Sequence, residues 1–262
     1  MPSADYSADL AVALEIVDAA DAVTSRRFRA ADLVIEAKPD LTPVSDADRA
    51  AEDLVRDRLA TQRPDDAFWG EETGETGSGP RRWVLDPIDG TKNFVRGVPV
   101  WATLLALLDG DEPVVGVVSA PALGRRWWAA RGHGAWGRDG TAEPRRLSVS
   151  GVSRLEDASL SYASLSGWTA RGRRDAFLAL TERVWRSRAY GDFWSYMLVA
   201  EGAVDIAAEP ELSVWDMAAL APIVVEAGGR FTGLDGIDGV WRGDAAASNT
   251  RLHGALLDAL RA

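Results

Sequence analysis

The segment Arg82–Val95, RWVLDPIDGTKNFV, constrains the fold more than any other stretch of the chain. Its apolar start is typical of a buried strand, and this strand ends on two aspartates, Asp86 and Asp89. A proline disfavours helical geometry in the residue before it, so we expect Asp86 to be extended and Asp89 to lie in the following turn. Both carboxylates can then face the same place.

The residues that follow favour a ligand of the opposite charge. Gly90 allows the backbone to approach a ligand closely. If a helix begins at Thr91, the first amide groups have no partner within the helix and can bind an anion. The segment therefore combines ligands for a cation with a site for an anion, and a phosphate ester held through metal ions satisfies both.

Composition excludes several kinds of site. The chain has 262 residues, 47% of them hydrophobic, which is enough for a substantial core in one domain or in two closely packed ones. Its formal net charge of -11 argues against nucleic acid and anionic membranes as partners. Without cysteine, disulfides and thiolate sites are excluded, and the two histidines, His133 and His253, exclude an all-histidine metal site.

The chain also lacks the signals that would direct it to a membrane. Its longest apolar run, residues 98–108, is too short for a membrane-spanning helix. Its first residues are acidic and lack the basic region of a secretory signal. We therefore expect a cytoplasmic protein.

Hydrophobic periodicity predicts an α+β layered sandwich, because helices and strands come in blocks rather than in strict alternation. Helices are predicted over roughly 8–28, after the N-cap Ser45, and over 173–185, 192–202 and 214–229, where Pro222 should kink the helix or begin a new first turn. Strands are predicted at 32–38, 66–72, in an antiparallel meander over 82–137, and at 159–164 and 203–209, with a flexible connector at 74–81. We expect two halves, 1–145 and 146–262, in one compact unit.

Four acidic residues stand beside apolar sequence, where an isolated charge is costly: Glu71, Asp86, Asp89 and Asp216. Without histidine or cysteine ligands, a hard cation such as Mg²⁺ is the natural compensator for such a cluster. Taken singly, each acid has another explanation, since the chain has 40 acidic residues and Asp216 can cap a helix. The segment DPIDGT as a unit is not explained in that way.

These segments resemble the inositol monophosphatase-like family of metal-dependent phosphatases. The matching pieces are PVSDAD (43–48), GEE (70–72), DPIDGTKNF (86–94) and WDMAALAPIVVEAGG (215–229), and they follow the family's order over nearly the whole chain. The resemblance implies an αβαβα sandwich of the inositol monophosphatase and fructose-1,6-bisphosphatase type. It also implies a homodimer with two or three Mg²⁺ per active site, Mn²⁺ as a substitute, and frequent inhibition by lithium.

The resemblance further implies which residues bind the metals. The implied ligands are five acids and one backbone carbonyl: Glu71, Asp86, Ile88, Asp89, Asp216 and Asp46. Among these, the Ile88 carbonyl would serve the first metal, Asp89 the second, and Asp46 a weaker third metal through water.

The resemblance assigns the phosphate and the water as well. Gly90 and Thr91 would form the phosphate cradle, and the Thr91 hydroxyl together with Glu71 would orient the attacking water. The implied reaction is direct in-line attack by a metal-bound water without a phosphoenzyme.

Three longer stretches, 86–108, 119–136 and 188–216, resemble actinobacterial-type histidinol-phosphatases within the family. Typical inositol phosphatases read DGTTNF, whereas this chain has Lys92, and the context RAYGDF places Asp192 downstream. Histidinol phosphate carries an amine, for which Asp192 and Glu209 are candidate partners. Asp192 is equally explained as an ordinary helix N-cap. Lys92 is a candidate for holding the phosphate or screening the site, or it is solvated. Arg188 is a candidate for pinning the substrate-facing loop, or it pairs with a surface carboxylate.

The sequence therefore predicts a Mg²⁺-dependent phosphomonoesterase that hydrolyses L-histidinol phosphate to histidinol and phosphate. One alternative is an inositol-1-phosphate phosphatase, or a broad sugar- or nucleotide-phosphate phosphatase. A rival from another class is a non-catalytic metal- or phosphate-binding regulatory protein on the same fold.

Overall fold

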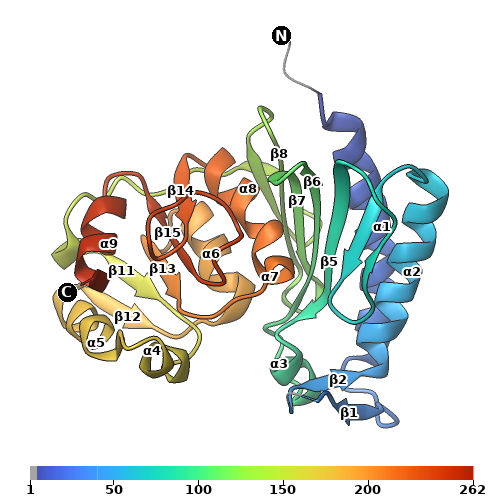
Figure 1. Ribbon diagram of the computed structural model, residues 1–262, viewed down its shortest axis with the longest axis horizontal. Helices are drawn as coiled ribbons and strands as arrows, with labels where there is room; N and C mark the ends of the chain where they lie inside the picture. Colours follow the sequence, from blue (N-terminus) through green and yellow to red (C-terminus); the bar gives the residue numbers. More distant parts are fainter. Residues whose placement is uncertain (1–4, 40, 262) are drawn as a thin grey trace.

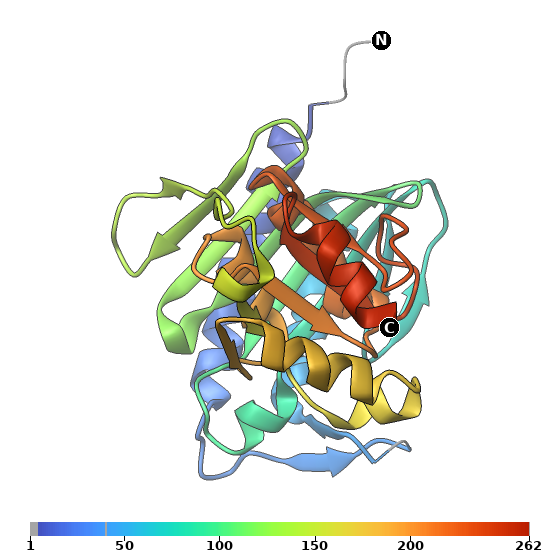
Figure 2. The same cartoon turned by 90° about the vertical axis from the view of Figure 1, so that its left-hand side faces the viewer.

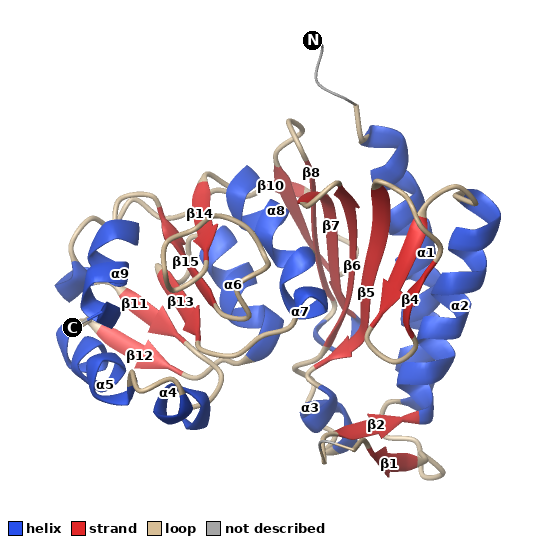
Figure 3. Ribbon diagram, viewed as in Figure 1, coloured by secondary structure: helices blue, strands red, loops and turns tan. Residues whose placement is uncertain are grey.

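Two β-sheets alternate with three layers of helices in the computed structural model, which describes residues 5–39 and 41–261 (Figure 1). The first four residues, part of the stretch in which we looked for a signal, lie outside that range. No helix in the described part of the chain is long and apolar enough to cross a membrane. The alternation of helical and sheet layers, confirmed here, is the predicted α+β sandwich (Figure 3).

The larger sheet has eight strands in the order β10-β9-β8-β7-β6-β5-β3-β4. Its strands are β3 (Ala67–Gly70), β4 (Gly74–Thr76), β5 (Arg81–Asp89), β6 (Ala102–Asp109), β7 (Glu112–Ala120), β8 (Arg125–Ala130), β9 (Ala135–Asp139) and β10 (Arg145–Arg146). Neighbours pair antiparallel except β3 and β5, which are parallel. The predicted meander over 82–137 is therefore correct.

Two long helices cover the outer face of this sheet, α1 (Ser7–Arg27) and α2 (Asp46–Gln62) (Figure 1). Apolar residues of both helices, among them Ile16 and Val55, pack with Trp83 and Leu105 of the sheet in one buried cluster. Ser45 caps α2 as predicted, and it does so in a reciprocal capping box with Asp48.

A small hairpin and a short helix lie at the end of the sheet where β5 stops (Figure 1). The hairpin pairs β1 (Ile35–Ala37) with β2 (Pro43–Ser45), and the helix is α3 (Thr91–Val95). Phe94 of α3 packs with Ala47, Ile88 and Trp101 in a separate buried cluster. This cluster anchors the turn that follows Asp89.

The middle layer contains α6 (Asp192–Ala200), α7 (Val214–Ala218) and α8 (Leu220–Glu226). The predicted helix at 214–229 is thus two helices, and Pro222 falls in the first turn of α8, where proline is tolerated. The break between them lies against β7, where a Cβ atom on Gly116 would stand 2.2 Å from the Ala219 carbonyl oxygen. Only glycine allows this approach.

The smaller sheet has five strands in the order β12-β11-β13-β15-β14. They are β11 (Ser159–Ser161), β12 (Arg186–Arg188), β13 (Ile206–Glu209), β14 (Gly229–Thr232) and β15 (Ala245–Asn249). The outer helices α4 (Ser166–Ala170), α5 (Arg174–Arg183) and α9 (His253–Arg261) lie over its far side (Figure 2). Two 3₁₀ turns, Pro121–Leu123 and Leu155–Asp157, complete the elements.

Some elements differ from the sequence prediction. The connector at 74–81 contains β4, which pairs with β3 at the sheet edge, because a strand edge satisfies backbone groups that a free loop leaves to water. Elements α4, α9, β12, β14 and β15 were not predicted. Strand β10 ends at Arg146, so the predicted division between residues 145 and 146 falls within it, and the two halves stay a proposal.

Candidate metal centre and active site

A cavity of about 780 Å³ opens where β5 ends. The hairpin β1–β2, strand β5, helix α3, the segment before α6, and α7 all contribute to its wall. Its lining includes most of the predicted site residues: Glu71, Asp86, Ile88, Asp89, Gly90, Thr91, Lys92, Asp192 and Asp216. Segments far apart in the sequence thus meet in one cavity.

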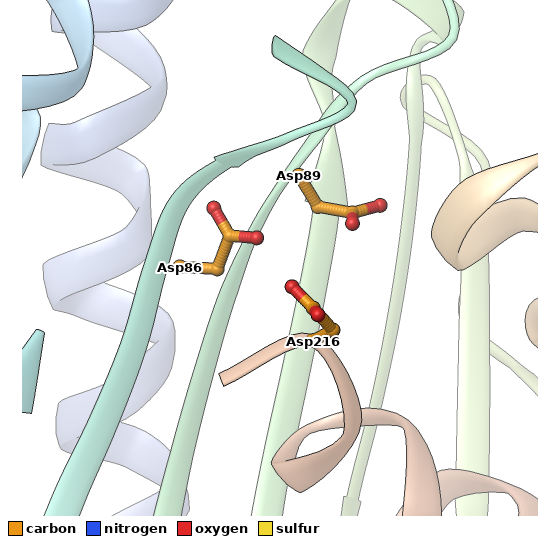
Figure 4. Close-up of side chains that lie close together, drawn as sticks. All are labelled: Asp86, Asp89 and Asp216. Atoms are coloured by element: carbon orange, nitrogen blue, oxygen red, sulfur yellow. The ribbon is translucent and has the colours of Figure 1, made fainter. Parts of the chain in front are cut away.

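Three aspartates converge in this cavity. One carboxylate oxygen from each of Asp86, Asp89 and Asp216 lies within 4.8 Å of the others. Figure 4 shows the three side chains pointing toward one another, two from the end of β5 and one from α7. DPIDGT predicts the convergence of Asp86 and Asp89, and the family resemblance adds Asp216.

Backbone amides fix the orientation of all three acids. Asp86 accepts a hydrogen bond from the Ile88 amide at 2.9 Å, and Asp89 accepts one from the Phe193 amide at 2.8 Å. Asp216 accepts one from the Ser213 amide at 2.6 Å, within the capping box of α7. The capping explanation for Asp216 is therefore correct, and capping holds the same carboxylate in the cluster.

The electrostatics show an uncompensated cluster. Removal from water, together with the charges of neighbouring acids, raises the pKa of Asp86 and of Asp89 well above the usual range. The same causes raise the pKa of Asp216 to about 7. Among the described residues, no lysine or arginine forms an ion pair with these three acids. Such a site is poised to bind a cation.

Glu71 is the fourth predicted ligand, and it lies beside a lysine. The Lys38 ammonium group is 2.7 Å from a Glu71 carboxylate oxygen and 2.6 Å from one of Glu72. Burial lowers the pKa of Lys38, but the bonds to these two acids outweigh it and hold the pKa above its usual range. Sequence reasoning missed Lys38, which the β1–β2 hairpin carries into the cavity wall.

Asp48 is a second residue that sequence reasoning missed. It is fully buried, and Oδ2 accepts hydrogen bonds from the Ser45 amide and hydroxyl. Its other oxygen has no hydrogen-bond partner. Burial, together with the charge of Glu71, raises the pKa of Asp48 to about 6. The sequence feature that could have identified Asp48 is its position at N3 of a helix capped by Ser45.

Neither Asp46 nor the buried Asp48 lines the cavity, but the two acids have different surroundings. The Asp46 carboxylate binds Arg27 at 2.7 Å and lines a separate hollow of about 340 Å³. Its role at a third metal stays a prediction, and Asp48 is the acid of this segment that faces Glu71.

The predicted phosphate cradle has the expected backbone. Gly90 has a φ of 84°, and it precedes α3 as the N-cap. Its positive φ is one that only glycine adopts without strain. The Thr91 hydroxyl donates to the Ile88 carbonyl at 3.1 Å. Both Thr91 and the Ile88 carbonyl therefore lie at the edge of the acidic cluster.

The substrate-facing candidates divide into two groups. Asp192 lines the cavity with a φ of 47°, and its carboxylate accepts a hydrogen bond from the Asn93 side chain at 2.9 Å. Gly191, not Asp192, is the N-cap of α6, so the ordinary capping explanation for Asp192 is wrong. Glu209 is buried behind the cavity, and Arg188 contacts the carbonyl of Ser187 instead of the cavity.

The residues present fit a hard divalent cation. The converging donors are all oxygen atoms, three of them from aspartates, and Asp48 adds an orphaned buried oxygen nearby. Hard cations such as Mg²⁺ and Mn²⁺ prefer such ligands.

The sequence and the fold match known proteins over nearly their whole length. A model described as "Inositol monophosphatase family" matches residues 5–262. The histidinol-phosphatase of Streptomyces coelicolor is 63% identical over 97% of each chain. That of Mycobacterium tuberculosis is 61% identical, covering 97% of this chain and 98% of its own. The solved structure of the extragenic suppressor protein suhB from Bartonella henselae superposes with a TM-score of 0.88 at 31% identity, covering 97% and 99%.

Proposed function

The chain belongs to the inositol monophosphatase family, and from this premise we propose that it is a Mg²⁺-dependent phosphatase that hydrolyses L-histidinol phosphate. The observation that carries the proposal is the convergence of Asp86, Asp89 and Asp216 beside the glycine turn. Two relatives above 60% identity bear the name histidinol-phosphatase, which supports the choice of substrate.

The acids would hold the metal and the turn would hold the phosphate. When bound, Mg²⁺ supplies Lewis acidity and lowers the pKa of water at the site. Glu71, Asp86, Asp89, Asp216 and the Ile88 carbonyl are the proposed ligands. Because these oxygens would bind cations, a phosphate ester could enter a cavity lined by so many negative charges.

The remaining polar groups would position substrate and water. The amides of Gly90 and Thr91 are proposed to bind phosphate oxygens, and the Thr91 hydroxyl to orient the attacking water. Asp48, with its unpartnered oxygen close to Glu71, is suited to accept a proton from that water. We therefore add Asp48 to the proposed catalytic residues.

Asp192 is the proposed partner of the substrate amine. Burial raises the pKa of Asp192, while the charge of Lys92 lowers it. The bond from Asn93 fixes its carboxylate at the cavity wall. An ammonium group would gain an ion pair there, whereas a polyol phosphate would not.

A phosphate-release assay tests the proposal. Histidinol phosphate, inositol 1-phosphate and fructose 1,6-bisphosphate are compared at equal concentration, with Mg²⁺ and with a chelator. We expect the largest kcat/KM for histidinol phosphate and no release with chelator. A preference for inositol 1-phosphate would overturn the proposed choice of substrate. Absence of turnover with Mg²⁺ would favour the alternative of a non-catalytic binding protein.

A second comparison tests Asp192 separately. Asp192→Asn should raise KM for histidinol phosphate about tenfold. It should leave KM unchanged for an analogue of histidinol phosphate that lacks the amino group. Equal losses for both compounds would show that Asp192 does not read the amine. The homodimer, the third metal, lithium inhibition and the cytoplasmic location stay predictions, as do the roles of Lys92, Glu209 and Arg188.

A further inference from the structure

A second cavity, of about 530 Å³, lies on the other side of the interface between the two sheets. Its walls come from the turn after β6, from α8 and β14, and from the loop at 238–241. Arg81 pairs with Asp109 at this end of β5, whereas Asp89 pairs with Ala102 at the catalytic end. The two cavities therefore lie at opposite ends of the same strands. Nothing in the proposed reaction uses the second cavity, which we call the interlayer cleft.

Both apolar and charged side chains line the interlayer cleft. The larger apolar side chains in the lining are Pro113, Pro222, Val225, Phe231 and Trp241. Four carboxylates and two guanidinium groups also line the cleft, which gives it a formal charge of -2. Its volume is in the range of small-molecule sites.

Most of the charged groups in the cleft are already paired. Arg131 binds Glu112, and Arg230 binds Asp238 at 2.8 Å. Glu226 accepts hydrogen bonds from the Gly132 and Gly134 amides at 2.8 Å each. The exposed Asp111 carboxylate forms no ion pair or side-chain hydrogen bond with any described residue.

Trp241 connects the apolar part of this lining to Asp111. Its indole N–H donates to the Asp111 carbonyl at 2.8 Å, and 43% of the residue is exposed. An aromatic face next to an uncommitted carboxylate favours a ligand that has both a flat ring and a positive charge.

A row of three indoles connects the two cavities. Trp241 stacks on Trp69 with ring centroids 6.3 Å apart, and Trp69 meets Trp215 edge to face at 5.8 Å. Trp215 lines the catalytic cavity and precedes Asp216, while Trp69 stands two residues before Glu71. The rings come from three distant segments, so their contact is a product of the fold.

We propose that the interlayer cleft is an effector site for a small aromatic ammonium ion, which acts on the metal centre through the Trp241–Trp69–Trp215 row. The ring lies against Trp241 and the ammonium group faces Asp111. The effect on the metal centre rests on the proposed function, whereas binding in the cleft does not. Binding in the cleft and coupling to the metal centre are tested by separate measurements.

Binding is measured first, on the metal-free protein, by fluorine NMR with 4-fluorobenzylammonium as the probe. The neutral 4-fluorobenzyl alcohol and the anionic 4-fluorobenzoate are the matched comparators. We expect the ammonium compound to bind best, because the free carboxylate and the net charge of the cleft favour a cation. Equal binding of all three compounds, or no binding, would overturn the proposal.

Variants locate the bound probe. Trp241→Ala should weaken binding at least tenfold, and Asp111→Asn about threefold. Trp136→Ala is the matched control, since its indole also donates to a turn carbonyl, that of His133 at 3.1 Å, but does not line the cleft. The catalytic cavity is acidic too, so Asp192→Asn is also tested. Binding that survives Trp241→Ala and is lost with Asp192→Asn would place the probe in the catalytic cavity and overturn the proposal.

Coupling is measured as the Mn²⁺ affinity, from the free-ion signal in electron paramagnetic resonance. Saturating probe should change this affinity at least threefold, and saturating Mn²⁺ should change the probe affinity by the same factor. Trp69→Leu should retain probe binding and abolish the change. Unchanged Mn²⁺ affinity, or coupling that persists in Trp69→Leu, would overturn the role of the row. Failure of Mn²⁺ to bind at all would instead contradict the proposed metal centre.

Discussion

The two ends of β5 place buried acids in opposite circumstances. At its start, Arg81 binds Asp9 at 2.7 Å and Asp66 at 3.0 Å, and Arg63 also binds Asp9. At its other end, the acids Asp86 and Asp89 meet Asp216 with no arginine or lysine of the described chain paired to them. The same residue type is neutralised by the protein in one place and left for a cation in the other.

This difference, rather than burial, distinguishes the acids that the chain neutralises from the proposed metal ligands. Asp66 also accepts the Trp83 indole N–H at 2.9 Å, so all its partners belong to the chain. Asp89 has one amide partner and otherwise faces like charges, which raise its pKa after the effect of burial. An acid whose partners are missing from its own chain is a candidate ligand-binding residue.

The largest effect is expected at the functional end. Asp89→Asn should lower kcat at least a thousandfold, about 4 kcal/mol, because a proposed metal ligand is lost. The fold should persist with an unchanged or slightly raised Tm, because one like charge leaves the cluster. The matched control is Asp66→Asn, which should keep kcat and lose stability. Near-normal turnover in Asp89→Asn would show that the two ends of β5 do not differ in the way described.

The next effect is expected at the structural end. Arg81→Met leaves Asp9 and Asp66 with fewer partners and should lower the free energy of unfolding by about 2 kcal/mol. The loss should stay below that of a fully buried pair, since 31% of the Arg81 side chain is exposed. Urea unfolding measures it, and kcat per folded molecule should not change. Unaltered stability would show that the arginines do not compensate these acids.

The pH dependence of stability should differ with and without metal. The pKa of Asp216 is raised from 3.8 to about 7, so between these values the folded, metal-free protein binds more protons than the unfolded chain. Its stability should therefore fall as the pH rises through this window. Mg²⁺ at a hundred times its Kd should add about 2.7 kcal/mol and should add more at higher pH. Tm measured from pH 5 to 8 checks both slopes, and a metal-free Tm that rises with pH would contradict the cluster.

The smallest effect is expected at Asp46, and it tests whether this residue belongs to the site. Asp46→Asn should change kcat less than twofold, because Asp46 binds Arg27 outside the cavity. Asp48→Asn serves as its comparison and should lower kcat by about tenfold to a hundredfold. A larger loss for Asp46→Asn than for Asp48→Asn would restore the original assignment of the third-metal residue.

Local patterns predicted the convergence of Asp86 and Asp89, because one segment carries both residues. DPIDGT fixes a strand, a turn and a glycine, so the positions of Asp86 and Asp89 follow from neighbouring residues alone. Asp48 was missed because the buried face of a helix is predicted from the spacing of its apolar residues. A buried acid does not contribute to that pattern. The row from Trp69 to Trp241 has no local signal, since its rings meet only through the packing of distant segments.

The catalytic cavity joins Lys38 of the first hairpin to Asp216 of α7, with Asp86 between them in sequence. Contacts between such distant positions form only after long loops have closed, which makes them slow to assemble. No fragment that lacks one sheet contains the complete set of acids. Catalysis is therefore among the last properties that this chain acquires as it folds, and regained activity reports that both sheets have come together.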